Sequence, residues 1–146
     1  MAKKKNIALI GPRGCGKTYV SLLLSQSLKQ PALSLDTLIS YEANGKSIPD
    51  ILAEHNGNWN YFREMEYKVL AKATSLEQVI IDCGGGIVID LDPCGEEILS
   101  QRKAILLQKH AKVFFLRAPT QQSIEKMSGN EHRPALRTDY SAEEIY

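Results

Sequence analysis

Eight residues near the start of the chain have the spacing of a phosphate-binding loop. Residues 11–18 read GPRGCGKT and directly follow an apolar run at residues 7–10. Glycines let such a loop turn back, so that backbone N–H groups point at phosphate oxygens near the N-terminus of the next helix. Lys17 would reach the β- and γ-phosphates, and the Thr18 hydroxyl would bind Mg²⁺. The residues predicted to bind ATP are Gly11, Gly14, Cys15, Gly16, Lys17, Thr18 and Tyr19.

The segments on either side of this loop have the order that a phosphate site needs. Residues 6–10 predict a short buried strand, and residues 19–28 predict a helix. Apolar residues share one face of that helix: Val20, Leu23, Leu24 and Leu28. An accidental glycine-rich turn is the alternative, but it would not require a strand before it and a helix after it.

Strands and helices alternate along the rest of the chain. We predict strands at residues 31–35 (ending at Asp36), 79–81 and 113–116, of which the last two are expected to be buried. We predict helices at residues 37–41, from Ser47 onward, and at 59–72, 96–109 and 120–127. The 59–72 helix has Phe62, Met65, Val69 and Ala73 on one face, with charged Arg63, Glu64, Glu66 and Lys68 on the rest. This alternation is typical of a parallel sheet covered by helices on both faces.

Two acidic residues come at the ends of predicted strands, where ligands bind in parallel sheets. Asp36 ends the second strand, and Asp82 ends the third, just before the glycines at 84–86. In many phosphate-loop enzymes, a carboxylate at the end of a buried strand helps to bind Mg²⁺. Asp82 is therefore a candidate metal ligand together with Thr18, and the alternative is that it only caps the glycine loop.

Composition limits the classes of protein to which the chain can belong. It has 146 residues, 43% of them hydrophobic, and a net charge of +1. These values predict one domain and give no sign of a nucleic-acid or membrane partner. The three cysteines have no paired spacing, so a zinc site or disulfide framework is not expected. We expect a cytoplasmic monomer.

A polar segment near the end of the chain contains two arginines. Residues 128–137 read SGNEHRPALR. A segment of this kind suits a lid that closes over a transferred phosphate, and the alternative is an ordinary surface loop.

The order and spacing of these motifs resemble those of the shikimate kinases over nearly the whole chain. The resemblance rests on the phosphate loop, Phe62-Arg63, the glycines at 84–86 and Arg133-Pro134. It implies a single P-loop kinase domain (1–146), similar to nucleoside-monophosphate kinases and built as a three-layer α/β/α sandwich. Within it, residues 37–73 form the substrate-binding region and 128–140 the lid. The implied reaction moves the ATP γ-phosphate to the 3-hydroxyl of shikimate, with Mg²⁺.

The resemblance also implies a role for each matched residue. Asp36 would hold the ring hydroxyls and take the proton from the attacking one, and Arg63 would bind the carboxylate. Arg133 would contact the phosphate in flight. The backbone against the substrate would come from Gly84, Gly85 and Gly86, and the catalytic residues would be Lys17, Asp36 and Arg133.

The chain departs from the family pattern in two places. The family usually has an aspartate two residues before the substrate-binding one, where this chain has Ser34. We therefore expect Asp82 to take over the metal-ordering role. Family members also continue into a helix with a second carboxylate-binding arginine and an adenine loop, so we expect a C-terminally shortened form. The alternative functions are an impaired nucleotide-binding module and another small-molecule kinase, such as a gluconate kinase; Arg63 and the triple glycine argue against the latter.

Overall fold

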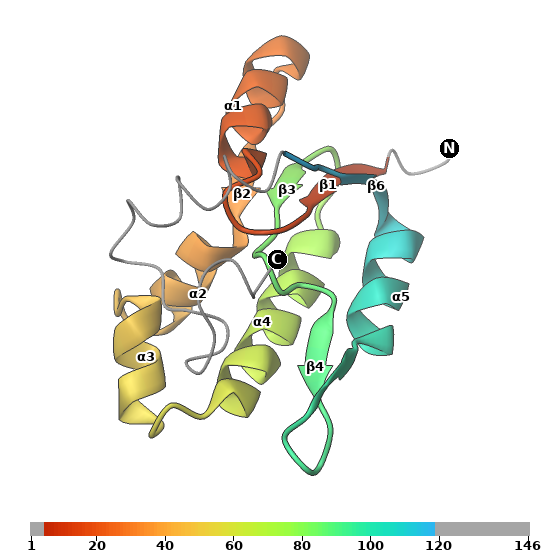
Figure 1. The fold of residues 1–146 in the computed structure, drawn as a ribbon. Coiled ribbons are helices and arrows are strands. Elements are labelled where there is room, and N and C mark those ends of the chain that lie inside the picture. Colours follow the sequence, from red (N-terminus) through yellow and green to blue (C-terminus); the bar gives the residue numbers. More distant parts are fainter. Residues whose placement is uncertain (1–4, 119–146) are drawn as a thin grey trace.

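The computed structural model describes residues 5–118. In chain order its elements are β1 (Asn6–Ile10), α1 (Lys17–Leu28), β2 (Ala32–Ser34), α2 (Leu35–Glu42), α3 (Ile48–Glu54), α4 (Trp59–Thr74), β3 (Ile80–Asp82), β4 (Ile89–Leu91), β5 (Glu97–Leu99), α5 (Gln101–His110) and β6 (Ala111–Phe115) (Figure 1). The predicted helix at 120–127, the lid at 128–140 and Arg133 lie outside the described residues.

The predicted parallel sheet is confirmed. Four parallel strands are hydrogen-bonded in the order β2-β3-β1-β6. Ala8 of β1 lies beside Ile81 of β3, and both side chains are fully buried in the core that α4 and α5 cover. Helix α1 packs on β1, β2 and β3. The sheet therefore carries β1 and β3 at its centre, and the loops that follow these two strands come out at the same edge.

The predicted helix at 59–72 is confirmed as α4 (Trp59–Thr74), and two of its charged residues are buried as well as its apolar face. Phe62, Val69 and Ala73 are buried as expected. Arg63 and Glu66 lie outside the apolar face and are nevertheless 4% and 1% exposed. The helix lies between α2 on one side and α5 on the other, so more than one of its faces is covered.

The predicted helix at 96–109 begins too early. Residues Glu97–Leu99 form a strand that pairs antiparallel with β4, and the helix begins at Gln101. Asp92 causes the turn, because its Oδ1 accepts hydrogen bonds from the N–H groups of Cys94 and Glu96 at 2.9 Å each. Ser100 then caps α5 by accepting from the N–H of Lys103. A serine before a helix is a start signal that the periodicity alone overlooked.

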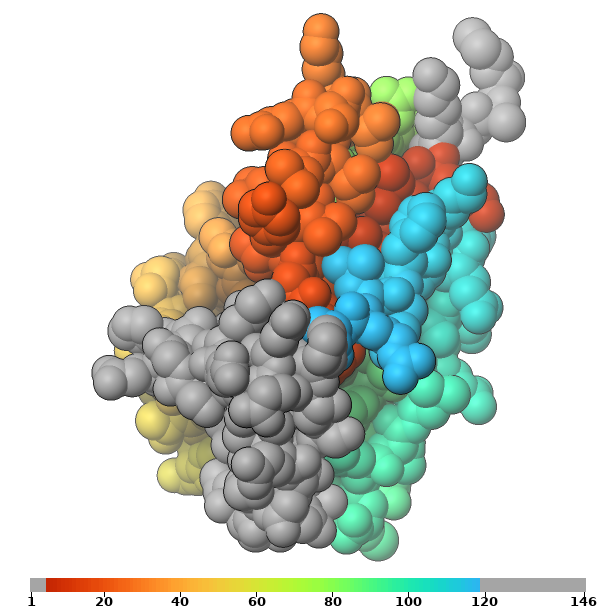
Figure 2. Space-filling model, turned by 45° about the horizontal axis from the view of Figure 1, so that its top comes forward, coloured from red at the N-terminus to blue at the C-terminus, as the bar shows by residue number. Residues whose placement is uncertain are grey.

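Two predicted apolar faces are not buried among the described residues. Leu23 and Leu28 of α1 are each 45% exposed, and Phe114 of the expected buried strand β6 is 46% exposed. Figure 2 shows α1, in orange, and β6, in blue, on one face of the molecule. Apolar periodicity indicates which face prefers burial, but whether that face is covered depends on what packs against it. No helix within residues 5–118 is long and apolar enough to cross a membrane.

Candidate active site

The loop between β1 and α1 has a backbone that requires its glycines. Gly14 and Gly16 have φ values of 77° and 95°, in the left-handed region that favours glycine. A side chain on Gly11 would collide with the carbonyl oxygen of Leu116, which follows β6. The loop is thus shaped by local backbone conformation and by close contact with a distant strand end.

The ammonium group of Lys17 lies inside this loop. Its Nζ donates hydrogen bonds to the carbonyl oxygens of Gly11 at 2.8 Å and Pro12 at 3.0 Å, and the side chain is buried. Cys15 fills the loop beside it, with its Sγ 3.7 Å from the ammonium nitrogen. Tyr19 is 68% exposed, so any contact that it makes to phosphate would come from its backbone N–H in the first turn of α1.

The two candidate metal-binding residues, Thr18 and Asp82, lie at the start of α1 and at the end of β3. The Thr18 hydroxyl donates a 2.7 Å hydrogen bond to Asp82 Oδ2. Asp82 is the last residue of β3, and in the sheet register it lies directly beside Ser34, the last residue of β2. A hydroxyl at the start of α1 and a carboxylate beside it suit Mg²⁺, which is typically held by one or two protein oxygens plus phosphates. The donor types that the chain offers therefore fit this ion.

Asp36 occupies the first turn of α2, not the end of a strand. The strand β2 ends at Ser34, whose hydroxyl caps α2 by accepting from the N–H of Thr37 at 3.3 Å. The Asp36 carboxylate nevertheless lies close to the glycine loop, because a Cβ built on Gly84 would be 3.1 Å from its Oδ1. The structure thus brings together two residues that we predicted to bind substrate.

Arg63 also lies against the glycine loop, and its side chain is buried. Its Nη1 donates to the carbonyl oxygen of Gly86 at 3.2 Å, and a Cβ on Gly86 would be only 2.6 Å from Nη2. The guanidinium carbon is 5.2 Å from the centre of the Trp59 ring. Only a glycine leaves room for the guanidinium at this position.

One cavity is lined by all the predicted substrate-binding residues. Its wall contains Asp36, Arg63 and the three glycines, together with Ile48, Trp59 and Phe62 from the predicted substrate-binding region. Two further wall residues, Arg13 and Glu66, were not predicted. Two sequence features could have indicated them. Arg13 lies within the predicted phosphate-binding loop, and Glu66 lies one helical turn after Arg63 on the same helix.

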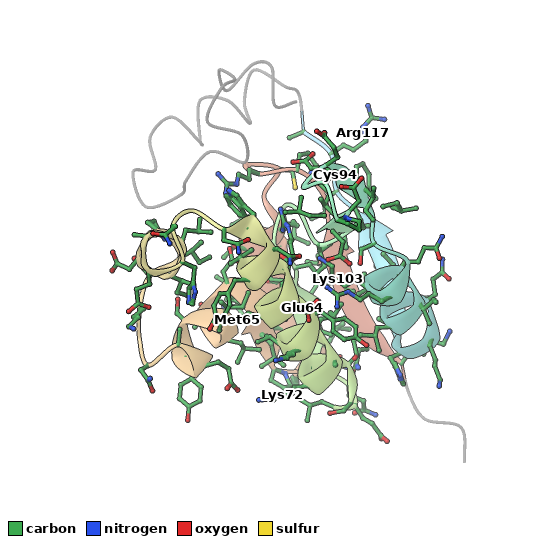
Figure 3. The ribbon with its side chains drawn as sticks, turned by 90° about the horizontal axis from the view of Figure 1, so that it is seen from below. Glu64, Met65, Lys72, Cys94, Lys103 and Arg117 are labelled. Atoms are coloured by element: carbon green, nitrogen blue, oxygen red, sulfur yellow. The ribbon has the colours of Figure 1, made fainter. Side chains whose placement is uncertain are left out.

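Two of the cavity-lining residues, Arg63 and Glu66, form a buried ion cluster with Lys103. Glu66 Oε1 accepts from Arg63 at 3.1 Å and from Lys103 of α5 at 2.6 Å. Figure 3 shows Lys103 between α4 and α5. Burial raises the pKa of Glu66 above its usual range, although the charges of Arg63 and Lys103 act in the opposite direction. Sequence reasoning missed this cluster, because a lysine on an amphipathic helix usually faces solvent.

Asp90 of β4 completes the cluster on its outer side. Burial alone would raise the pKa of Asp90, but hydrogen bonds from Arg102 and Ser100 hold it below its usual value. Arg102 binds both Asp90 oxygens, at 2.9 and 3.0 Å, and also Glu64 at 2.7 Å. The β4–β5 hairpin is thereby joined to α4 and α5 next to the cavity.

The shikimate kinase family model matches residues 13–146. A shikimate kinase from Leptospira borgpetersenii serovar Hardjo-bovis is 44% identical over 133 residues, which cover 91% of this chain and 74% of the relative. The chain belongs to the shikimate kinase family.

A solved shikimate kinase agrees with this assignment. The shikimate kinase from Acinetobacter baumannii in complex with shikimate has a TM-score of 0.80 and 28% identity, covering 97% of this chain and 72% of that one. A gluconokinase from Sinorhizobium meliloti has a TM-score of 0.57 at 14% identity, which shows the shared fold alone. The predicted P-loop kinase fold and family are thus confirmed.

Proposed function

We propose that this chain transfers the γ-phosphate of ATP to the 3-hydroxyl of shikimate. The observation that carries the proposal is the cavity beside the phosphate loop, whose wall holds both a carboxylate, Asp36, and a buried guanidinium, Arg63. An acceptor with hydroxyls on one side and a carboxylate on the other matches these two groups. Family membership supports the same acceptor.

The phosphate side of the reaction would use the loop between β1 and α1. Lys17 now donates to loop carbonyls, and its ammonium could turn to the β- and γ-phosphates, where its charge would stabilise the transition state. Thr18 and Asp82 would hold Mg²⁺, which supplies charge neutralisation on the phosphates when bound. We propose Arg133 as a further positive charge on the transferred phosphate, on the basis of its family motif.

The acceptor side would use Asp36 and the arginines of the cavity. The 3-hydroxyl oxygen would attack the γ-phosphorus in line while the bond to the bridging oxygen breaks, so that ADP leaves. Asp36 would take the hydroxyl proton. Arg63 would bind the carboxylate through its planar guanidinium, and Arg13 lines the same cavity as a second candidate for this contact.

The proposed function can be tested by following ADP release from the 146-residue chain in a coupled assay. Four acceptor conditions should be compared: shikimate, shikimate methyl ester, gluconate and none. We expect ADP release to depend on shikimate, with one phosphorylated product formed per ADP. The methyl ester should have a kcat/KM about 10- to 150-fold lower, because a hydrogen bond to a charged group contributes about 1.5–3 kcal/mol. No dependence on shikimate, or equal activity with gluconate, would overturn the proposal.

A further inference from the structure

One carboxylate oxygen in the buried cluster serves two cations. Glu66 Oε1 accepts from Arg63 Nη1 at 3.1 Å and from Lys103 Nζ at 2.6 Å. Lys103 is fully buried, and Glu66 is 1% exposed. The Lys103 ammonium also donates to the carbonyl oxygen of Ile89 at 2.6 Å. Lys103 therefore has partners from both α4 and β4, and its position is well determined.

The charges of these three groups do not cancel. Arg63 and Lys103 are positive and Glu66 is negative, so these three buried groups together carry one positive charge. Arg13 and Asp36, which also line the cavity, have opposite charges and leave that excess unchanged. The next carboxylate, Asp90 Oδ1, is 3.7 Å from Lys103 Nζ, and Asp90 is already bound by Arg102 through two hydrogen bonds. Buried charge is costly unless it is paired, so the cluster would be stabilised by an anion in the cavity.

The remaining contacts of Arg63 indicate that its guanidinium is positioned but not saturated. Its Nε is buried and has no hydrogen-bond partner among the described residues. Its Nη1 is shared between Glu66 and the Gly86 carbonyl. If Lys103 were absent, Glu66 would be balanced by Arg63 alone, and the pair would become neutral. The guanidinium would then have less attraction for a second carboxylate.

We propose that Lys103 is a positioning residue for substrate binding: it neutralises Glu66, so that Arg63 keeps its charge available for the acceptor's carboxylate. This inference rests on the proposed function. The competing explanation is that Lys103 only ties α5 to α4 and β4. That role would change stability but would not weaken shikimate binding selectively.

The test replaces Lys103 with methionine, alone and together with Glu66→Gln. The alkyl chain keeps most of its volume, and the double variant removes the buried carboxylate along with the buried ammonium. Lys72→Met is the matched control, because Lys72 is an exposed lysine of α4 whose partner is Glu42. Trp59 is the only tryptophan in the chain and lines the cavity, so its fluorescence reports shikimate binding without turnover.

We expect Lys103→Met to raise the Kd and KM for shikimate about tenfold or more at pH 8, with the KM for ATP and kcat little changed. The double variant should return both constants to within about threefold of the unmodified chain, because Arg63 regains its excess charge. Lys72→Met should leave them unchanged. Thermal unfolding of each variant should be measured in parallel.

Two results would overturn this inference while leaving the proposed function intact. One is unchanged shikimate binding in a folded Lys103→Met variant. The other is a double variant that binds shikimate at least tenfold more weakly than the unmodified chain, a comparison that holds even if the single variant does not fold. If the unmodified chain neither binds nor phosphorylates shikimate, the proposed function fails and this inference fails with it.

Discussion

The Thr18 hydroxyl lies 2.7 Å from Asp82 Oδ2 and joins the start of α1 to the end of β3. Because Asp82 and Ser34 are register neighbours in the sheet, a carboxylate at either position would face nearly the same region beyond the strand ends. This relationship supports our hypothesis that Asp82 replaces the metal-ordering aspartate missing at position 34.

Changing Asp82 to asparagine should therefore raise the Mg²⁺ concentration needed for half-maximal activity, whereas Ser34→Ala should change it little. Adding Ser34→Asp to the Asp82→Asn variant should restore part of the loss. Mg²⁺ titration of the initial rate measures all three. Ser34 also caps α2, so thermal unfolding is needed to separate loss of the cap from loss of metal binding. Equal Mg²⁺ requirements in the two single variants would contradict the hypothesis.

Replacing Lys17 with alanine should lower kcat about a hundredfold or more, because a preorganised positive charge on the phosphates is lost. The ammonium currently binds loop carbonyls of Gly11 and Pro12. Steady-state kinetics measures the effect, and circular dichroism should show that the variant stays folded. A folded variant that keeps most of its turnover would show that the phosphate-loop assignment is incorrect.

Gly86→Ala should weaken shikimate binding through Arg63. An added Cβ would be 2.6 and 2.7 Å from the two terminal guanidinium nitrogens and would displace the side chain. We expect the shikimate Kd from Trp59 fluorescence to rise about tenfold or more, with ATP affinity largely retained. Arg63→Lys is the comparison, since it keeps the charge but loses the planar pair of donors. Normal shikimate binding by Gly86→Ala would argue against contact between Arg63 and substrate.

The contribution of Asp90 to stability should depend on pH. Its pKa is lowered in the folded chain, so its stabilisation is present above the unfolded value of about 3.9 and is lost as pH falls through the folded value. Asp90→Asn should reduce the free energy of unfolding by about 1–3 kcal/mol at pH 7. The difference should shrink below about pH 4.

Urea unfolding at several pH values measures this difference. Glu54→Gln is the control, because the Glu54–Lys46 pair is exposed and should contribute about 1 kcal/mol or less. A deficit in Asp90→Asn that is the same at pH 3 and pH 7 would mean that the charge of Asp90 contributes nothing.

The phosphate loop and α4 could be predicted from the sequence because each depends on local spacing. Glycines at 11, 14 and 16 allow the loop conformation, and apolar residues from Phe62 to Ala73 repeat with the helical period. The Phe62-Arg63 pair and the glycines at 84–86 likewise indicated the family directly. These patterns carry their information within a few residues, so no tertiary contact was needed to interpret them.

The charged residues of the site could not be interpreted in this way. A charge on an amphipathic helix has the same sequence pattern whether it faces water or a buried partner, and the partners here are far apart in the chain: Glu66 with Lys103, and Thr18 with Asp82. Only the packing of α5 against α4, and the parallel register of β2, β3 and β1, brings them within hydrogen-bond distance. The sequence by itself therefore predicted a phosphate-binding loop and determined the family and its fold. The tertiary structure decided which charges are buried together, because burial is what converts a solvated charge into a fixed part of the site.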